Sequence, residues 1–402
     1  MSNRANNPIV ALVLAGGGAR AAYQVGVLKA VAEMLPKDAK NPFPIVCGTS
    51  AGAINAAAIA IHASRFQHGI RRLVRVWRHF RVSQVFRADG WGIFRSGLQW
   101  LGAMLFGGLG KYNPHALLDR TPLSGLLSRY LPCAKIKHSI DNGALLAFSI
   151  TASGYTSGQS VSFFQGAESL HSWARARRIG IATDINIDHL LASSAIPFVF
   201  SAIKINREYY GDGSMRQTSP LSPALHLGAE RIFVIGVHSE KFEAPERFSA
   251  QSYPSMAEVA GYVLDSIFLD SLETDLERLR RINKTISLIP SHNLKENNVT
   301  LRPVDVLVVT PSEDLNHIAS RFVHELPTPV RMLLYGIGVM NRRGSNLVSY
   351  LLFERGFCRE LIELGYKDAL RRKEEIMAFL GQEMPEKATA SSNPVLPESV
   401  EG

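Results

Sequence analysis

One serine lies in a sequence context that suits a nucleophile. Ser50 is the central residue of the pentapeptide Gly48-Thr49-Ser50-Ala51-Gly52, which fits the pattern G-x-S-x-G. In this pattern the serine occupies a sharp turn between a strand and a helix, and the glycines relieve steric conflict on both sides. The turn presents the hydroxyl at a helix N-terminus, where the helix dipole and free N–H groups favour the negative charge that develops during acyl transfer. An apolar segment precedes the pentapeptide and a helix-forming segment follows it, so we interpret Ser50 as a nucleophile rather than as part of a structural turn.

A glycine-rich loop near the N-terminus is suited to bind an anion. Gly16, Gly17 and Gly18 lie between an apolar run and a segment with helical spacing, and Ala19 and Arg20 follow them. Because the glycines have no side chains, their N–H groups can approach an anion closely. The loop therefore predicts an oxyanion hole, in which the glycine N–H groups face the oxygen of a tetrahedral intermediate and Arg20 supports the loop or the charge. A tight turn without a ligand is the alternative.

The same loop also fits, in part, a dinucleotide-binding pattern. Gly16, Gly18 and Ala21 match G-x-G-x-x-A. That fold needs an acidic residue at the end of its second strand to bind a ribose, and residues 48–50 of this chain are Gly-Thr-Ser. An oxyanion hole is therefore favoured over a dinucleotide site.

A nucleophilic serine needs a general base, and Asp212 has the most distinctive surroundings. It lies between Gly211 and Gly213, where a β-rich run ends. This context holds a carboxylate at the end of a strand, where it can hydrogen-bond a serine hydroxyl directly. The segment fits an ordinary Asp-Gly turn equally well. The α/β-hydrolase fold with its Ser-Asp-His triad is disfavoured, because a single predicted strand precedes Ser50 and no downstream histidine lies in a glycine-flanked turn.

Alternating strands and helices must position these residues. Residues 9–14 predict a buried strand, and the helical spacing of Val25, Leu28, Ala32 and Leu35 predicts a helix after the glycine loop. A second strand, a turn and an alanine-rich helix follow over residues 45–60. Further strands are predicted at residues 144–151, 203–210, 231–237 and 304–309. Strands that alternate with helices indicate a parallel sheet covered on both faces.

The C-terminal part of the chain has a mostly helical pattern. Residues 255–284 predict a long helix with a charged end, and residues 326–380 continue the helical pattern. Residues 381–402 contain four Glu, three Pro and no aromatic residue, which predicts a disordered tail. We therefore divide the chain into a catalytic unit at residues 8–240, a helical region at 250–380 and this tail.

Four ordered blocks of the chain resemble those of the patatin-like phospholipase family. They are the glycine loop at 16–20, the elbow at 48–52, an Ala-Ser pair with its following proline at 192–197, and Asp212-Gly213. The resemblance covers residues 8–236 and implies a three-layer α/β/α sandwich with a mainly parallel sheet, joined here to the mostly helical C-terminal region. It also implies a dyad without histidine, in which Ser50 is the nucleophile and Asp212 the base. The reaction implied is hydrolysis of lipid acyl esters without a metal or another cofactor.

Two residues depart from the family pattern. Ala21 follows Arg20 where the family often has glycine, and Ser214 follows Gly213 where it has glycine or alanine. Neither change removes a reacting group. They bear on the rate and the substrate range rather than on the class of reaction.

The net charge of the chain limits its partners. Its 402 residues include 44 Lys and Arg against 35 Asp and Glu, a formal charge of +9, and 46% of them are hydrophobic. This composition describes a globular chain, and three cysteines exclude a disulfide-stapled scaffold. A basic surplus suits nucleic acid, an anionic membrane surface, or solubility alone.

An insertion at residues 65–140 contains much of the basic charge. Its segment 71–87 has six arginines interleaved with Trp77, Phe80 and Phe86, and residues 91–110 are mostly apolar. No nucleic-acid-binding module accompanies this pattern, so we expect no nucleic-acid partner. Across residues 71–110 we predict either an interfacial element, whose arginines contact anionic headgroups while its apolar part enters the acyl boundary, or a helical lid packed on the protein's own core.

These features together predict a serine hydrolase that cleaves lipid acyl esters, of the phospholipase A or lysophospholipase type. An acyl thioesterase or acyltransferase with the same dyad is one alternative, and a non-catalytic scaffold that binds a membrane or a partner is another. No signal peptide or clean transmembrane helix is recognisable in the sequence. We therefore expect a cytoplasmic protein, either free or peripheral on the inner face of the membrane.

Overall fold

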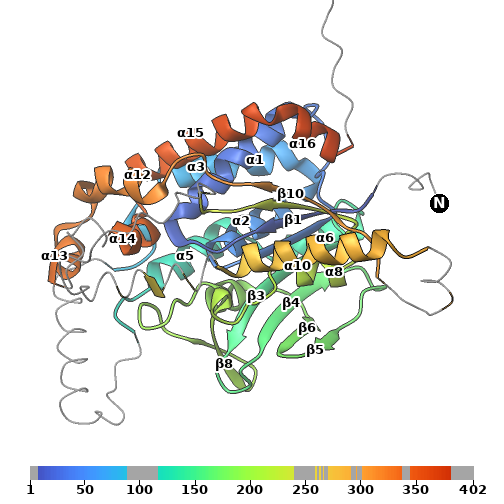
Figure 1. Ribbon diagram of the computed structural model, residues 1–402. Coiled ribbons are helices and arrows are strands. Elements are labelled where there is room, and N and C mark those ends of the chain that lie inside the picture. The colour runs from blue at the N-terminus through green and yellow to red at the C-terminus, as the bar shows by residue number, and fades with distance from the viewer. Residues whose placement is uncertain are drawn as a thin grey trace, which may run out of the picture.

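The computed structural model describes residues 8–87, 116–239, 270–290, 301–336 and 345–381, together with positions 259, 262, 263, 266 and 296. The apolar segment predicted at 91–110 and residues 382–402 of the predicted tail lie outside the described residues. Within them, a ten-stranded sheet lies between layers of helices (Figure 1). This is the three-layer α/β/α architecture that the sequence predicted.

The sheet is parallel in its centre and mixed at one end. Its strands are β1 (Val10–Leu14), β2 (Ile45–Thr49), β3 (Ala147–Gly154), β4 (Ser160–Gly166), β5 (Trp173–Arg175), β6 (Arg178–Ala182), β7 (Ile203–Ile205), β8 (Glu208–Asp212), β9 (Arg231–Ile235) and β10 (Asp305–Val309). Their order is β10-β9-β1-β2-β3-β4-β6-β5, with β8 also paired to β3 and β7 to β8. The strands from β10 to β3 run parallel, whereas β4 and β8 run antiparallel to β3. The carboxyl ends of β1 and β2 therefore meet at one edge, from which the glycine loop and the elbow continue.

Helices cover both faces of the sheet. They are α1 (Ala22–Met34), α2 (Ala51–Ile61), α3 (Phe66–Arg78), α5 (Thr121–Tyr130), α6 (Ala134–Asp141), α7 (Ile187–Ser193), α8 (Ser222–His226), α10 (Asp270–Ser287), α12 (Leu315–Phe322), α13 (Thr328–Gly336), α14 (Ser345–Leu351), α15 (Arg355–Arg371) and α16 (Lys373–Phe379). Figure 1 shows α1, α15 and α16 on one side of β1 and β10, and α8 and α10 on the other.

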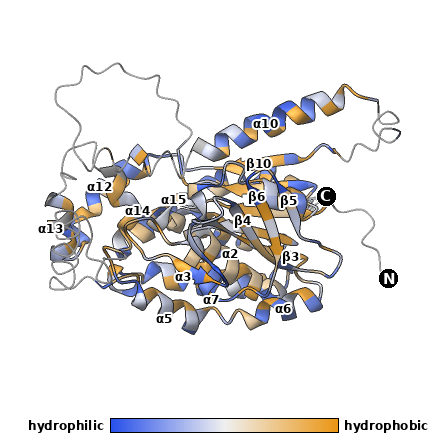
Figure 2. Cartoon of the chain, turned by 90° about the horizontal axis from the view of Figure 1, so that it is seen from below, coloured by the Kyte–Doolittle hydropathy of each residue, from blue (hydrophilic) through white to orange (hydrophobic). Residues whose placement is uncertain are grey.

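The alternation of side chains along β1 explains why both faces are covered. Val10, Leu12 and Leu14 pack into the larger core with α1, α2, α3 and α15, whereas Ala11 and Val13 pack into a second core with α8 and α10. Successive residues of a strand point to opposite faces, so a strand that is apolar throughout needs helices on both sides. In Figure 2, α10 carries hydrophobic and hydrophilic residues along its length, as expected for a helix with one covered and one solvent-facing side.

Some predicted elements differ from those in the structure. The single strand predicted at 203–210 is wrong, because β7 and β8 form a hairpin that turns at Asn206 and Arg207. Asn206 has a φ of 54°, a conformation that asparagine tolerates better than most residues. Strands β4, β5 and β6 were not predicted.

The C-terminal region is mostly helical, as predicted, and it also contributes to the sheet and the main core. β10 pairs in parallel with β9, and α15 packs closely on α1. A side chain at Gly26 would overlap the carbonyl group of Ile362, and one at Gly365 would overlap that of Tyr23. Glycine in both helices is therefore what lets their backbones touch.

The basic part of the insertion forms α3 and the turn after it. Trp77, Phe80 and Phe86 are 4%, 6% and 0% exposed, so these aromatic residues pack in the core, as the helical-lid alternative predicts for this part. The six arginines of the segment are exposed: Arg71, Arg72, Arg75, Arg78, Arg81 and Arg87. None of the helices in the described part of the chain is both long and apolar enough to cross a bilayer.

Candidate active site

Ser50 forms the sharp turn between β2 and α2. Its backbone has φ 54° and ψ −129°, in a region that residues other than glycine rarely adopt. A Cβ at Gly48 would lie 2.6 Å from the Cα of Ala53, and one at Gly52 would overlap the carbonyl groups at the end of β1. Only glycine fits on either side of Ser50, so the strained elbow that the pentapeptide predicts is present.

Ser50 and Asp212 are hydrogen-bonded to each other. Ser50 Oγ donates to Asp212 Oδ2 at 2.6 Å, although the two residues are 162 positions apart. Asp212 ends β8 and is 0% exposed, and Ser50 is 2% exposed. The N–H of Ser214 donates to Asp212 Oδ1 at 2.9 Å, and the N–H of Asp212 donates to the carbonyl of Ala195 at 2.9 Å. The carboxylate is therefore held on one oxygen and faces the serine hydroxyl with the other.

Burial raises the pKa of Asp212 to about 6. Hydrogen bonds from Ser50 and Ser214 and the positive charge of Arg120 oppose this increase, because they stabilise the carboxylate. The Arg120 guanidinium is itself buried and donates to two backbone carbonyls. Asp212 is therefore mostly ionised at neutral pH and more basic than an exposed aspartate, which suits a general base.

A second serine supports the elbow. Ser193, the last residue of α7, accepts a hydrogen bond from the N–H of Ser50 at 2.9 Å and donates one to the carbonyl of Thr151 at 2.6 Å. Thr49 is held in a similar way, because its Oγ1 donates to Gln217 Oε1 at 2.7 Å. Ser193 belongs to the Ala-Ser pair that the sequence singled out, but nothing in the sequence indicated its bond to Ser50. Gln217 was not predicted at all, and no local signal distinguishes it.

The glycine loop contributes one residue to the wall of the pocket that contains Ser50. Gly18 lines this pocket together with Ser50 and Ala51, and its φ of 55° favours glycine. Gly18 begins a short 3-10 helix and Ala51 begins α2, so neither N–H has an acceptor within its own helix. Gly16 and Gly17 are buried and precede this position. The two N–H groups of Gly18 and Ala51 are therefore the candidates to bind an anion beside Ser50.

The guanidinium of Arg20 contacts the C-terminal helices rather than the pocket. Its Nε donates to Ser349 Oγ at 2.8 Å and its Nη2 to Asn316 Oδ1 at 2.7 Å. Its Cζ lies 3.9 Å from the ring centre of Tyr350. Asn316 belongs to α12, and Ser349 and Tyr350 belong to α14. We expected Arg20 to support either the glycine loop or the negative charge of the oxyanion. These contacts correspond to support of the loop.

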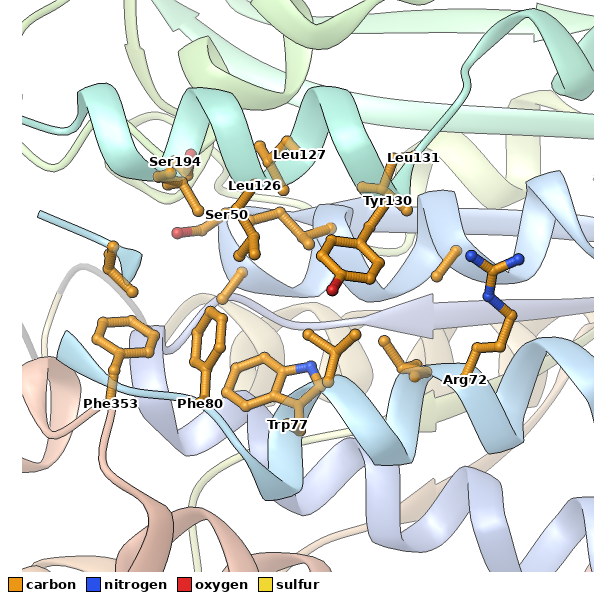
Figure 3. Close-up of a pocket in the computed structure, with 18 of the residues that line it drawn as sticks. Ser50, Arg72, Trp77, Phe80, Leu126, Leu127, Tyr130, Leu131, Ser194 and Phe353 are labelled. Atoms are coloured by element: carbon orange, nitrogen blue, oxygen red, sulfur yellow. The ribbon is translucent and has the colours of Figure 1, made fainter. Parts of the chain in front are cut away.

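An apolar pocket begins at Ser50 and runs between α2, α3 and α5 (Figure 3). About 930 Å³ of space lies among its lining residues, a volume that includes open solvent. Its walls include Leu73, Val76 and Trp77 of α3 and Leu123, Leu126 and Leu127 of α5. A pocket with such walls suits an alkyl chain.

The polar groups near Ser50 include those that acyl transfer requires. They are a serine hydroxyl, a buried carboxylate that accepts its proton, and two N–H groups at helix N-termini. Among the described residues, no group of three or more His, Cys, Asp or Glu side chains is placed to bind a metal ion. The arrangement therefore supports a nucleophilic serine with a carboxylate base.

Comparison with known proteins points to one family. The model of the patatin-like phospholipase family matches residues 12–225, which include the glycine loop, the elbow and Asp212. Among solved structures, the chain is similar to the crystal structure of VipD from Legionella pneumophila, with 13% sequence identity and a TM-score of 0.38 over 92% of this chain and 67% of that one. No curated protein sequence matches the chain.

Proposed function

Because the chain belongs to the patatin-like phospholipase family, we propose that it is a serine hydrolase of lipid acyl esters with Ser50 as nucleophile and Asp212 as general base. The observation that carries this proposal is the 2.6 Å hydrogen bond between Ser50 Oγ and Asp212 Oδ2, made at one end of an apolar pocket. Phospholipids and lysophospholipids are the substrates we favour, because their acyl chains suit the pocket and their esters suit the nucleophile.

Acylation begins when Ser50 Oγ attacks the carbonyl carbon of the ester. Asp212 accepts the hydroxyl proton as the new C–O bond forms, and the carbonyl electron pair moves onto the oxygen. The N–H groups of Gly18 and Ala51 donate to this oxyanion, in the loop that Gly16 and Gly17 also shape. The intermediate then collapses, and Asp212 returns the proton to the leaving alcohol.

Deacylation repeats these steps with water. Asp212 accepts a proton from the water that attacks the acyl carbon on Ser50. The same N–H groups bind the second oxyanion. Asp212 then protonates Ser50 Oγ as the acyl–oxygen bond breaks, and the fatty acid leaves.

Labelling with a fluorophosphonate tests the dyad. The wild-type protein should be labelled, and Ser50→Ala should not. Asp212→Asn should be labelled roughly 10² to 10⁴ times more slowly, because it lacks the base. Ser64→Ala, which changes an exposed serine just beyond α2, is the matched control and should be labelled like the wild type. Absence of labelling in the wild type, or equal labelling of Ser50→Ala, would exclude the proposed nucleophile.

The products from a mixed lipid extract test the type of substrate. Release of free fatty acid together with a lysophospholipid, or with a deacylated headgroup, supports the phospholipase or lysophospholipase assignment. An acyl-thioester substrate that is cleaved faster than any oxygen ester supports a thioesterase. An acyl group recovered on a second lipid supports an acyltransferase.

We also propose that the exposed face of α3 contacts an anionic membrane surface. The inward face of this helix is buried through Ile70, Leu73 and Trp77, so its arginines project to the outside. Arg72 also lines the pocket, at the end away from Ser50 (Figure 3), which places positive charge at that end of the pocket. Arginines in this position attract anionic headgroups and bring the site close to its lipid.

Vesicles of phosphatidylcholine with and without phosphatidylglycerol test this contact. Arg72→Glu, Arg75→Glu and Arg78→Glu in one chain should abolish the preference for anionic vesicles. The control reverses three exposed charges on α10, across the sheet: Arg280→Glu, Arg281→Glu and Lys284→Glu. The control has the same net charge as the α3 variant and should keep most of its binding to anionic vesicles. Equal losses in both variants would assign the binding to net charge instead of α3.

A further inference from the structure

The pocket follows one face of α2 away from the nucleophile. Residues that line it recur along α2 and its two ends at Ser50, Ala51, Ile54, Ala58 and His62. From Ala51 onward their spacing is three or four residues, which places them on one stripe of a helix. Figure 3 shows Ser50 toward one end of the pocket, Arg72 at the other and Tyr130 between them. The pocket is therefore elongated, and α2 forms one of its long walls.

Small residues keep the space beside α2 open. Ala51 and Ala58 project little from the helix toward the pocket. On the opposite wall, a Cβ at Gly69 of α3 would lie 2.5 Å from the Cβ of His62. The two helices therefore contact each other at His62, and this contact limits the space between them at the far end of α2.

Helix geometry gives the length of this wall. Ser50 and His62 are 12 residues apart in the sequence, which is about 18 Å at 1.5 Å per residue. An extended alkyl chain advances about 1.3 Å per carbon, because its single bonds are about 1.5 Å long and meet at tetrahedral angles. The wall therefore matches about 14 carbons.

The residues at the far end of the pocket are polar and reach solvent. Arg72 is exposed and His62 is half-buried. Burial and the nearby Arg72, His68 and Lys135 lower the pKa of His62 to about 4, and Arg72 and Lys135 place positive charge near this end. A methylene group that passes His62 leaves the apolar walls and gains little from further burial.

We propose that α2 acts as a ruler for the acyl chain of the substrate. The carbonyl carbon lies at Ser50, the chain runs along α2, and the pocket is filled by about 14 carbons. This inference rests on the proposed function, since it takes an acyl ester as the substrate and Ser50 as the nucleophile. Ala58 and His62 are then the residues that determine specificity, because they set the usable length of the wall.

A series of p-nitrophenyl esters with acyl chains of increasing length tests the ruler. With the detergent held constant, kcat/KM should rise roughly twofold to fourfold for each added methylene up to about 14 carbons and change little beyond that length. A maximum at the shortest chains, or a rise that continues unbroken well past this length, would overturn the ruler. Hydrolysis of none of the esters would instead overturn the proposed function.

Ala58→Phe tests the position of the wall. Ala58 is eight residues from Ser50, about 12 Å or nine carbons along the helix. With a phenyl ring there, kcat/KM should stop rising with chain length at about eight carbons instead of about 14. The 14-carbon ester should also lose at least about tenfold in kcat/KM relative to the eight-carbon ester. Ala134→Phe makes the same change at an exposed position of α6 outside the pocket and should keep the wild-type ratio.

Ala58→Leu keeps the test usable if the phenylalanine variant does not fold. Thermal unfolding reports whether each variant is folded, and labelling of Ser50 reports whether its nucleophile is intact. In the leucine variant, kcat/KM should stop rising at a chain length between that of Ala58→Phe and that of the wild type. A folded Ala58 variant that retains the wild-type ratio of long-chain to short-chain activity would show that α2 is not the ruler.

Discussion

Ser50 and Asp212 are polar residues that meet in the interior of the protein. Their hydrogen bond is 2.6 Å long, and both residues are almost completely buried. Burial raises the pKa of Asp212 to about 6, so this carboxyl group changes its charge close to neutral pH. At the residue scale, the pH dependence of both activity and stability should therefore reflect Asp212.

The activity should depend on the ionisation of Asp212. Only the carboxylate can accept the proton of Ser50, so kcat/KM should be constant above pH 7 and fall as the pH decreases through about 6. Measurement of kcat/KM on a short soluble ester across this range checks the prediction, with thermal unfolding at each pH as the control for folding. An acid limb near pH 4 would show that the environment of Asp212 does not raise its pKa.

Replacing Asp212 by asparagine should stabilise the fold at alkaline pH. The pKa of Asp212 is raised from 3.8 to about 6 on folding, because burial favours its protonated form. The contribution of this protonated group to the stability of the fold is therefore fully present below pH 3.8 and is lost as the pH rises through 6. At pH 8 the buried carboxylate therefore costs at most about 3 kcal/mol. Asp212→Asn removes this charge while its amide oxygen can still accept the hydrogen bond from Ser214.

Thermal unfolding at several pH values checks this stabilisation. The Tm of Asp212→Asn should exceed that of the wild type by a few degrees at pH 8, and the difference should shrink toward pH 5. Asp38→Asn, a change at an exposed position, should show no such trend. A Tm for Asp212→Asn below that of the wild type at every pH would mean that the lost hydrogen-bond geometry outweighs the removed charge.

At the scale of elements, helices from the C-terminal region hold the glycine loop in place. The Arg20 guanidinium joins the loop to Asn316 of α12 and Ser349 of α14 through bonds of 2.7 and 2.8 Å. A side chain at Gly18 would overlap the carbonyl of Tyr350 in α14. Phe353, just beyond α14, lines the pocket itself. These helices lie outside the segment that the family model matches, yet they complete the surroundings of the site.

Arg20→Lys should impair catalysis more than binding. Lysine cannot reproduce the two-pronged contact of the guanidinium, so the loop that presents Gly18 should shift. We expect kcat to fall roughly tenfold to a hundredfold while KM changes little, because displacement of the proposed oxyanion hole would affect the transition state rather than the proposed acyl pocket. Steady-state kinetics on one ester series measures both constants.

Arg359→Lys provides the matched control for this change. Arg359 is an exposed residue of α15 whose Nε donates to a backbone carbonyl at 3.1 Å. Its replacement should leave kcat within about twofold of the wild type. A rise in KM with unchanged kcat in Arg20→Lys would indicate that Arg20 shapes the substrate pocket instead of the oxyanion hole.

At the scale of the whole molecule, one sheet and one main core join the two halves of the chain. β10 from the C-terminal region pairs with β9, and α15 packs on α1 through the glycines Gly26 and Gly365. The main core contains residues from both halves. Removal of the C-terminal half would expose one edge of β9 and the apolar face of α1.

A chain that ends at residue 240 should therefore fail to fold into a soluble, reactive protein. Its exposed strand edge and helix face favour aggregation. The soluble fraction and the fluorophosphonate labelling of this fragment check the prediction. A chain that ends at Gly381 is the control, because it keeps β10 and α12 to α16. A soluble, cooperatively unfolding and labelled fragment would show that residues 8–240 form an independent catalytic domain.

The sequence predicted the elements next to the site better than the far end of the sheet. β1, β2, α1 and α2 are apolar throughout or have clear helical spacing, and these patterns are local. β4 was missed because Ser160 and Ser162 lie among its apolar residues although they are only 4% and 5% exposed. Buried polar residues of this kind obscure a strand pattern, since their partners belong to other strands.

The sequence by itself determined the elbow and the glycine loop. A turn at Ser50 and a loop at Gly18 depend on backbone conformations that neighbouring glycines permit, and neighbouring residues are visible in the sequence. Only the tertiary structure decided that Asp212 reaches Ser50 and that Ser193 holds its N–H. It also decided that Arg20 turns to α12 and α14 and that a pocket follows α2. These contacts join segments far apart along the chain, and the packing of helices on a twisted sheet sets their distances.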